Sequence, residues 1–344
     1  MKELSQLVRP NILALKPYSC ARDEFRGRKA EVFLDANENP YNQPLNRYPD
    51  PLQEEVKKAL ERIKGVRAEQ MFLGNGSDEA IDLVYRIFCE PGKDNVVAIE
   101  PTYGMYGVCA EVNNVAYRRV LLDEHFDLVA DRVLEATDEL TKVIWLCSPN
   151  NPTGNVFAKE DLLWFLDNVN AMVIIDEAYI DFSEKGTMVE MLDKYPNLIV
   201  LQTFSKAWGQ AAIRLGIALA SEEVIGYFNK VKYPYNVNIL TQQHAIKVLN
   251  DVDRKERNVA EILAQRDILR DLLLSVPCVK EVYPSDANFL LCRVSDADAI
   301  YAYLQHKGII VRNRNRVTLC ANCLRITVGT PTENAEIYET LKEI

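Results

Sequence analysis

The chain has 344 residues, of which 48% are hydrophobic, and its formal net charge is −10. This length and composition allow a large buried core and two or three domains, whereas the acidic balance makes nucleic acid or an anionic membrane a poor partner. No apolar run approaches the roughly 18–20 residues of a membrane-spanning helix, and the N-terminus lacks the pattern of a secretion signal, so we expect a cytoplasmic protein.

The predicted elements fall into three stretches. Residues 1–35 have weak periodicity, and we expect them to pack with a smaller C-terminal domain. Residues 36–235 alternate helical patterns with short runs that are apolar throughout, which favours strands covered on both faces, as in a parallel sheet. The stretch therefore predicts a larger α/β domain with a mostly parallel central sheet. Its helical patterns span 79–89 and 158–168, and its apolar runs span 96–99, 143–147, 172–175 and 198–201.

The pattern changes after residue 235, and residues 236–344 predict the smaller α+β domain. We expect one long helical segment over 239–274, a strand over 288–292, a helix over 297–306 and strands near Ile309 and Leu324. The last helix has a clear start, because Thr330 can cap it, Pro331 suits its first position and Glu333 completes a capping box.

Neither the cysteines nor the histidines indicate a metal site. Most of the eight cysteines lie in apolar segments and are expected in the core; examples are Cys89, Cys109, Cys147 and Cys292. Cys320 and Cys323 have the spacing of half a zinc site, but no second pair accompanies them, and the three histidines are isolated. We predict no metal and leave the role of this pair open.

Polar motifs follow three of the apolar runs, where open α/β sheets place their ligands. Residues 148–154 read SPNNPTG, Asp176 and Tyr179 end the next strand, and Ser205 and Lys206 follow a third, with Arg214 eight residues further on. Taken singly, each motif is weak: Asp176 would suit a helix cap and Lys206 a solvated surface lysine.

Together and in this order, the Asn-Pro-Thr-Gly, Asp-x-x-Tyr and Ser-Lys-(x)7-Arg motifs resemble those of the fold-type I aminotransferases, which use pyridoxal 5′-phosphate. The resemblance implies that Lys206 holds the cofactor as a Schiff base and, once freed, moves a proton between substrate and cofactor. It implies that Asp176 keeps the pyridine nitrogen protonated and that Asn151 and Tyr179 reach the 3′ oxygen. Tyr103 matches the residue that stacks on the ring.

The same resemblance implies a cup for the cofactor phosphate. Gly76, Ser77 and Asp78 precede a helical pattern, and a helix N-terminus offers free N–H groups and a positive dipole end to an anion. These residues alone favour an ordinary capped helix, and the resemblance reverses that interpretation. Ser205 and Arg214 are expected to bind the same phosphate.

Segments outside this shared core are similar to the histidinol-phosphate aminotransferase family, and the resemblance covers nearly the whole chain. It implies histidine biosynthesis: transfer of the amino group of L-histidinol phosphate to 2-oxoglutarate, giving imidazole-acetol phosphate and L-glutamate. It also implies a homodimer in which Tyr48 reaches the neighbouring subunit's cofactor phosphate. The segments that carry this resemblance are 17–22, 35–40, 46–50, 101–106 and 324–330.

Arginines suit this pair of substrates, because a guanidinium binds either a phosphate or a carboxylate. By resemblance, Arg312 and Arg325 hold the substrate anion and Tyr18 lies at the substrate phosphate. The alternation of Arg312, Arg314 and Arg316 would also fit a solvated edge strand. We therefore assign Arg312 alone of these three to the site and leave Arg314 and Arg316 at the surface.

Other functions stay open to different degrees. An aromatic or broad-specificity aminotransferase, or a phosphothreonine-type decarboxylase, would share Lys206, Asp176 and the phosphate cup. A transcription regulator with a degenerate aminotransferase-like domain needs a basic DNA-binding segment, and a nicotinamide oxidoreductase needs a complete G-x-G-x-x-G; both are disfavoured. Trp208 and Gln210 stand where apolar or small residues are more usual, which leaves local packing and fine substrate preference open.

Overall fold

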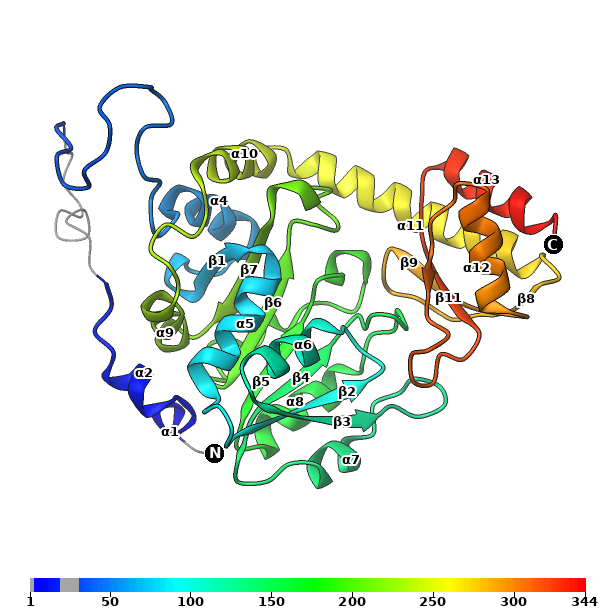
Figure 1. The fold of residues 1–344 in the computed structure, drawn as a ribbon, viewed down its shortest axis with the longest axis horizontal. Coiled ribbons are helices and arrows are strands. Elements are labelled where there is room, and N and C mark those ends of the chain that lie inside the picture. Colours follow the sequence, from blue (N-terminus) through cyan, green and yellow to red (C-terminus); the bar gives the residue numbers. More distant parts are fainter. Residues whose placement is uncertain (1–2, 19–30) are drawn as a thin grey trace.

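Two β-sheets organise the protein. The computed structural model describes residues 3–18 and 31–344. It contains a seven-stranded sheet, in the order β1-β7-β6-β5-β4-β2-β3, and a four-stranded sheet, in the order β10-β11-β9-β8 (Figure 1). The larger sheet consists of β1 (Met71–Asn75), β2 (Asn95–Glu100), β3 (Ala116–Leu121), β4 (Thr141–Cys147), β5 (Met172–Asp176), β6 (Leu198–Thr203) and β7 (Leu215–Ala220). The smaller one consists of β8 (Val279–Val282), β9 (Phe289–Val294), β10 (Arg312–Asn313) and β11 (Cys323–Thr327).

The centre of the larger sheet is parallel and buried on both faces, as the apolar runs predict. Strands β3, β2, β4, β5 and β6 pair in parallel, and β7 runs in the opposite direction, so its pairings with β6 and with β1 are both antiparallel. Alternate residues of β4 enter different hydrophobic clusters: Val143 and Trp145 one, Ile144 and Leu146 the other. Each cluster is the core between one face of the sheet and the helices that cover it.

Helices cover this sheet and connect its strands (Figure 1). The α-helices of this part are α4 (Glu54–Lys64), α5 (Gly76–Phe88), α6 (Met105–Val112), α7 (Ala130–Glu135), α8 (Lys159–Asn168), α9 (Glu222–Val231) and α10 (Ile239–Leu249). Four short 3-10 helices join them: η1 (Ala68–Gln70), η2 (Ile180–Phe182), η3 (Met188–Met191) and η4 (Ala211–Ile213).

The first described residues pack on the larger sheet's helices, not on the smaller sheet as we expected. Helices α1 (Leu4–Leu7) and α2 (Pro10–Ala14) bury Leu7 and Ile12 in one cluster with residues of α5 and α9. Arg9 adds an ion pair with Glu90 at 3.2 Å. The prediction was wrong here because α5 and α9 leave apolar surface that these side chains cover.

The smaller sheet has its own core, and the long helix α11 (Val252–Leu274) leads to it (Figure 1). Helices α12 (Ala297–His306) and α13 (Pro331–Leu341) complete this part. The single helix expected over 239–274 is two, because Asp251 caps α11 and ends the run from α10. The predicted capping box of α13 is confirmed: Glu333 accepts from the Thr330 N–H at 2.7 Å, and Thr330 accepts from the Glu333 N–H at 3.4 Å.

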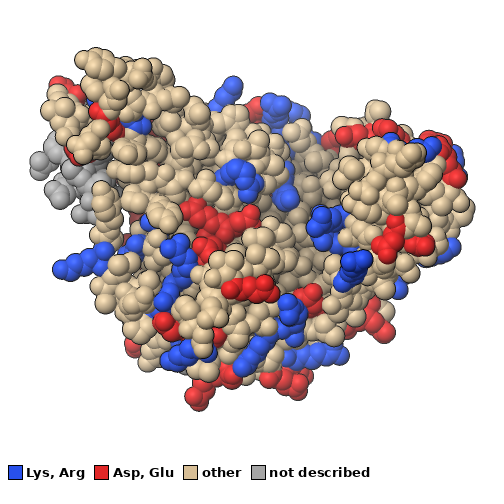
Figure 2. Space-filling view, viewed as in Figure 1, with Lys and Arg blue, Asp and Glu red and all other residues tan. Residues whose placement is uncertain are grey.

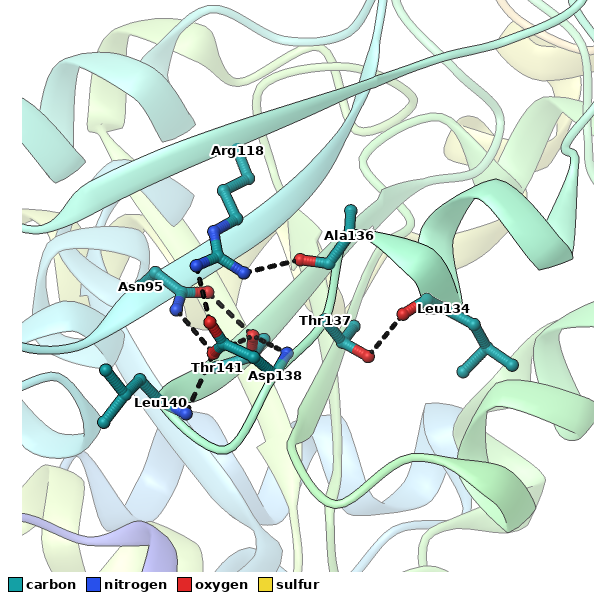
Figure 3. Close-up of polar contacts among 8 residues, drawn as sticks. All are labelled: Asn95, Arg118, Leu134, Ala136, Thr137, Asp138, Leu140 and Thr141. Atoms are coloured by element: carbon teal, nitrogen blue, oxygen red, sulfur yellow. Dashed lines mark hydrogen bonds and ion pairs between the residues drawn. The ribbon is translucent and has the colours of Figure 1, made fainter.

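A polar network joins β2, β3 and the segment before β4 near the N-terminal ends of these strands (Figure 3). Asp138 accepts hydrogen bonds from Asn95 at 2.9 Å and from Arg118 at 2.6 Å, and Thr141 donates to Asn95 at 2.7 Å. The Asn95 and Arg118 hydrogen bonds hold the pKa of Asp138 well below its usual range. The network fixes the starts of the strands at the edge opposite to their carboxyl ends.

The described surface and cysteines agree with the composition. Acidic and basic side chains are interspersed over the face in Figure 2. No helix of residues 3–18 and 31–344 is long and apolar enough to cross a membrane, and this part of the chain holds no group of three or more side chains suited to a metal. The cysteines expected in the core, Cys89, Cys109, Cys147 and Cys292, are buried there.

Candidate active site

A cavity of about 450 Å³ lies between the carboxyl ends of the parallel strands and the β10–β11 segment of the smaller sheet. It brings together all but two of the predicted site residues. Its lining consists of Gly76, Ser77, Asp78, Tyr103, Cys147, Asn151, Asp176, Ala178, Tyr179, Thr203, Ser205, Lys206, Ala211, Arg214, Arg312, Arg314 and Arg325.

Sheet topology explains this convergence. Asn151 follows β4, Asp176 ends β5, and Lys206 follows β6, and these three strands are parallel neighbours. Their carboxyl ends therefore meet at one edge, although the residues are far apart in sequence. Strand β7 then returns antiparallel along β6, with Gly216 opposite Thr203, and this hairpin carries Arg214 back to the same edge.

The environment of Lys206 favours a neutral amine. Burial lowers the pKa of Lys206, and the positive charge of Arg325 lowers it further, while Asp176 and Asp78 act in the opposite direction. The Lys206 Nζ lies 5.3 Å from the ring centre of Tyr179. A lysine amine attacks a carbonyl only when deprotonated, so these surroundings suit a nucleophilic or proton-transferring role.

Asp176 lies in the buried floor of the cavity. Tyr106 donates a hydrogen bond to its Oδ2 at 2.6 Å, and the Ala178 N–H donates to its Oδ1 at 3.1 Å. Burial raises the pKa of Asp176, whereas the Tyr106 hydrogen bond opposes the rise. A cationic group in the cavity would favour the ionised carboxylate. Tyr106 is not among the predicted site residues, because its contact with Asp176 depends on how α6 packs.

The N-terminus of α5 forms a narrow cup with Arg214. A Cβ added at Gly76, whose φ is +71°, would lie 2.6 Å from the Arg214 Nη2. A Cβ at Gly216 would lie only 2.1 Å from the Ser77 nitrogen, so β7 approaches the first turn of α5 without side chains between them. Asp78 accepts from Tyr103 at 3.1 Å and lies 3.5 Å from Arg214. Free N–H groups, hydroxyls and a guanidinium at a helix start suit a phosphate.

Residues of both sheets meet on the other side of the cavity. Arg325, on β11, donates a hydrogen bond to the Asn151 Oδ1, and its guanidinium lies 5.2 Å from the ring centre of Phe289. Asn151 in turn donates to the Tyr179 hydroxyl at 3.5 Å. The smaller sheet thus contacts Asn151 through Arg325 and Tyr179 through Phe289, whose ring centre lies 5.1 Å from that of Tyr179; both residues were predicted to bind the cofactor.

The structure corrects the predicted position of one arginine, Arg314. Arg314 lines the cavity and is half-buried, so its expected surface position was wrong, whereas Arg316 is exposed as expected. Arg312 and Arg314 border the cavity, whereas the chain turns at residues 315–316 and leaves Arg316 in solvent. Trp208 and Gln210 do not line the cavity; the Trp208 ring stacks on Phe204 at 5.3 Å.

Two predicted tyrosines lie outside this cavity. Tyr18 is 73% exposed, and of the motif over 17–22, residues 19–22 lie outside the described part of the chain. Tyr48 is half-exposed and stacks on Tyr235, with 4.5 Å between the ring centres. A position outside the chain's own cavity is compatible with the predicted role of Tyr48 in a neighbouring subunit, and both roles stay predictions.

Comparison with known proteins places the chain among enzymes. The family model for class I and II aminotransferases matches residues 24–341. The chain is 60% identical to the histidinol-phosphate aminotransferase of Bacteroides thetaiotaomicron over 343 residues, which cover 100% of this chain and 99% of that protein.

Solved structures share the fold. The histidinol-phosphate aminotransferase of Sinorhizobium meliloti, in complex with pyridoxal-5′-phosphate, matches with a TM-score of 0.80 and 21% identity, covering 97% of this chain and 96% of that one. L-threonine-O-3-phosphate decarboxylase of Porphyromonas gingivalis matches with a TM-score of 0.75 and 20% identity, covering 87% and 90%. The fold is thus common to transaminases and decarboxylases.

The fold, the cavity and the family match define the protein as a member of the class I and II aminotransferases. Because the fold alone is shared with a decarboxylase, the narrower assignment depends on sequence identity. At 60% identity over full length, the chain belongs to the histidinol-phosphate aminotransferase family.

Proposed function

We propose that the protein transfers the amino group of L-histidinol phosphate to 2-oxoglutarate, giving imidazole-acetol phosphate and L-glutamate, with pyridoxal 5′-phosphate as cofactor. The observation that carries this proposal is one cavity that holds a lysine of lowered pKa, Lys206, a buried carboxylate, Asp176, and basic groups at two ends. Full-length identity to histidinol-phosphate aminotransferases supports the substrate.

The residues present fit this cofactor. The α5 N-terminus with Ser77, Ser205 and Arg214 would hold its phosphate, and Asp176 would pair with its protonated ring nitrogen. Asn151 and Tyr179 would donate to its 3′ oxygen, and Tyr103 would lie against its ring; all three residues line the same cavity. When bound, the cofactor supplies an electron-withdrawing ring that stabilises negative charge at the carbon bearing the amine.

The protein's own groups supply the proton transfer and the orientation. Lys206, whose pKa is lowered by burial and by Arg325, would accept the proton from the substrate carbon that bears the amine and pass it to the cofactor, and it would move a proton the opposite way in the second half-reaction. Asp176 stabilises positive charge at the base of the cavity, and Tyr106 orients this carboxylate. The arginines of the smaller sheet bind the substrate's anionic end and so fix its reacting carbon near Lys206.

We further propose that the protein is a cytoplasmic homodimer in which Tyr48 completes the partner's site. Each subunit would consist of a larger domain, residues 36–235, and a smaller one, residues 236–344. The exposed apolar side chains of residues 31–48 support the dimer: Leu34 is 90% exposed, Tyr41 76% and Val32 74%. Apolar groups gathered on one segment indicate a surface that another chain covers. A second copy is the occupant that the family resemblance implies.

Two measurements test the function. The purified protein with cofactor should absorb near 410–430 nm (a rough expectation for the cofactor class), and borohydride should fix the cofactor to the peptide that contains Lys206. The Lys206→Ala variant should bind the cofactor, but borohydride should not attach the cofactor covalently to it. With histidinol phosphate and 2-oxoglutarate, glutamate should form. Carbon dioxide release from a phosphorylated amino acid, or no glutamate, would contradict the proposed reaction.

A further inference from the structure

The segment after α12 directs alternate side chains to opposite sides. Asn313 and Asn315 both donate to Asp298 on α12, at 2.6 Å and 2.8 Å. Arg312, just before Asn313, and Arg314, between the two asparagines, line the cavity. The hydrogen bonds to Asp298 thus hold Asn313 and Asn315 toward α12, while Arg312 and Arg314 border the cavity.

The β11 strand fixes the same segment from its other edge. Arg312 is paired with Arg325 in the β10–β11 register, and the Arg314 N–H donates to the Cys323 carbonyl at 2.9 Å. Arg312 and Arg325 thus line the cavity from paired strands, and Arg314 lines it from the residue after β10, which this backbone hydrogen bond ties to β11. Side chains on paired strands are held more exactly than side chains on a free loop.

These three arginines lack counter-charges. Across residues 3–18 and 31–344, none of them has a carboxylate within 4.0 Å, and the Arg314 Nε is buried without a hydrogen-bond partner. Burial, followed by the charges of Arg325 and Arg312, lowers the pKa of Arg314 to about 10. Arg314 and Arg325 are partly buried, and like charges that are partly desolvated side by side are costly, so an anion bound among them would remove much of that cost.

The charge of the anion separates the two substrates. A phosphomonoester carries about −1.5 to −2 charges near neutral pH and presents three oxygens, whereas a carboxylate carries one charge and two oxygens. One or two guanidiniums satisfy a carboxylate in a bidentate geometry. A third guanidinium would pair with the additional charge and the additional oxygen of a phosphate.

We propose that Arg314 is a specificity-determining residue that binds the phosphate of the phosphorylated amine and contributes little to the carboxylate substrate. This inference rests on the proposed function. Arg325 and Arg312 serve both substrates, and Arg314 adds the charge that only the phosphorylated one requires. The paired asparagines on Asp298 hold Arg314 in place before substrate arrives.

Half-reactions of the cofactor-loaded protein test this directly. Each amino donor, histidinol phosphate or glutamate, is mixed with the enzyme alone and the cofactor absorbance is followed. Arg314→Gln should lower kcat/KM for histidinol phosphate by roughly ten- to hundred-fold and for glutamate by less than about three-fold. Arg316→Gln, an exposed arginine of the same segment, is the matched control and should change neither.

Arg314→Lys separates charge from geometry. It keeps the charge but loses the planar fork, so it should restore only part of the histidinol phosphate rate. It also serves if the glutamine variant folds poorly, which melting temperature and cofactor content would reveal. Equal losses for both donors in Arg314→Lys and Arg314→Gln, or no loss, would overturn the proposal.

Inorganic phosphate distinguishes this inference from the proposed reaction. Phosphate, compared with chloride at equal ionic strength, should inhibit the glutamate half-reaction of the wild type more strongly than that of Arg314→Gln. If the wild type fails to use histidinol phosphate but shows this difference, the proposed reaction is wrong and the phosphate site remains. If inhibition by phosphate is the same in both proteins, Arg314 does not bind phosphate.

Discussion

Tyr106 donates a hydrogen bond of 2.6 Å to the Asp176 Oδ2, and both side chains are buried beneath the cavity. This contact opposes the rise in the pKa of Asp176 that burial causes. Tyr106 also stacks on Trp145, with 4.6 Å between ring centres, so its hydroxyl is held in place by packing. The pKa of Asp176, at the end of β5, therefore depends on Tyr106, which lies on α6 between β2 and β3.

Tyr106→Phe should impair activity and shift its pH dependence. Loss of the hydrogen bond raises the pKa of Asp176. As the pH is lowered, the variant's carboxylate is therefore protonated, and its activity lost, at a higher pH than in the wild type. We expect kcat/KM to drop roughly tenfold. The pH profile is the measurement that matters, because a simple packing defect would leave the acid limb in place. Tyr85→Phe is the control: its buried hydroxyl bonds the Tyr106 carbonyl at 2.7 Å, and its loss should lower only stability.

Arg325→Gln should raise the pKa of Lys206. The guanidinium charge is the second cause of the lowered pKa, after burial, and its removal leaves burial and the smaller effect of Arg214 to favour the neutral amine. In cofactor-free protein, the pH midpoint for acylation of Lys206, followed by peptide mass spectrometry, should move to higher pH. Arg293→Gln removes an arginine of the same sheet that does not line the cavity, and should leave the midpoint where it is. An unmoved midpoint in Arg325→Gln would mean that the two charges do not interact.

Gly216→Ala should disrupt the phosphate cup. Its Cβ would lie 2.1 Å from the Ser77 nitrogen, so the start of α5 must shift. We expect a stability loss of about 1–3 kcal/mol together with weaker cofactor retention during dialysis. Gly226→Ala is the matched control, because a Cβ there has open space on α9, and it should be neutral or stabilise by about 0.5–1 kcal/mol. Full cofactor retention in Gly216→Ala would show that the cup tolerates displacement.

Mixing two defective chains tests whether Tyr48 acts across a dimer. Neither Lys206→Ala nor Tyr48→Ala should support full activity alone. In a hybrid dimer, one site combines both defects and the other is intact if Tyr48 serves the partner. Random exchange should then restore about a quarter of the wild-type activity, given a symmetric dimer. Activity no higher than the average of the two unmixed variants would place Tyr48 within its own subunit's site or outside any site.

Sequence reasoning found the parallel centre of the sheet but not its antiparallel return. The runs that became β2, β4, β5 and β6 are apolar because both faces are covered. Strand β7 is equally buried, and an apolar run does not reveal strand direction. Strand β3 escaped notice because it is an edge strand with partly exposed side chains.

For the site, motifs located the residues that follow strands and failed where a side chain's surroundings decide its role. Lys206, Asp176 and Asn151 lie together as strand ends in a parallel sheet require. Arg314 was misplaced because alternation identifies a face without saying whether solvent or a cavity borders it. Tyr106 was missed because its contact with Asp176 depends on how α6 packs, which no local pattern encodes.

The β6–β7 hairpin has a consequence for how this chain can vary. Thr203 and Gly216 are paired across it, and Lys206 and Arg214 both lie on the connection between them. A residue inserted or deleted between Lys206 and Arg214 would change the separation of the two cationic groups while the strands at both ends stay in register. Length changes in surface connections of the larger sheet meet no such constraint. We therefore expect this connection to keep its length across functional relatives even where its residues, such as Trp208 and Gln210, are replaced.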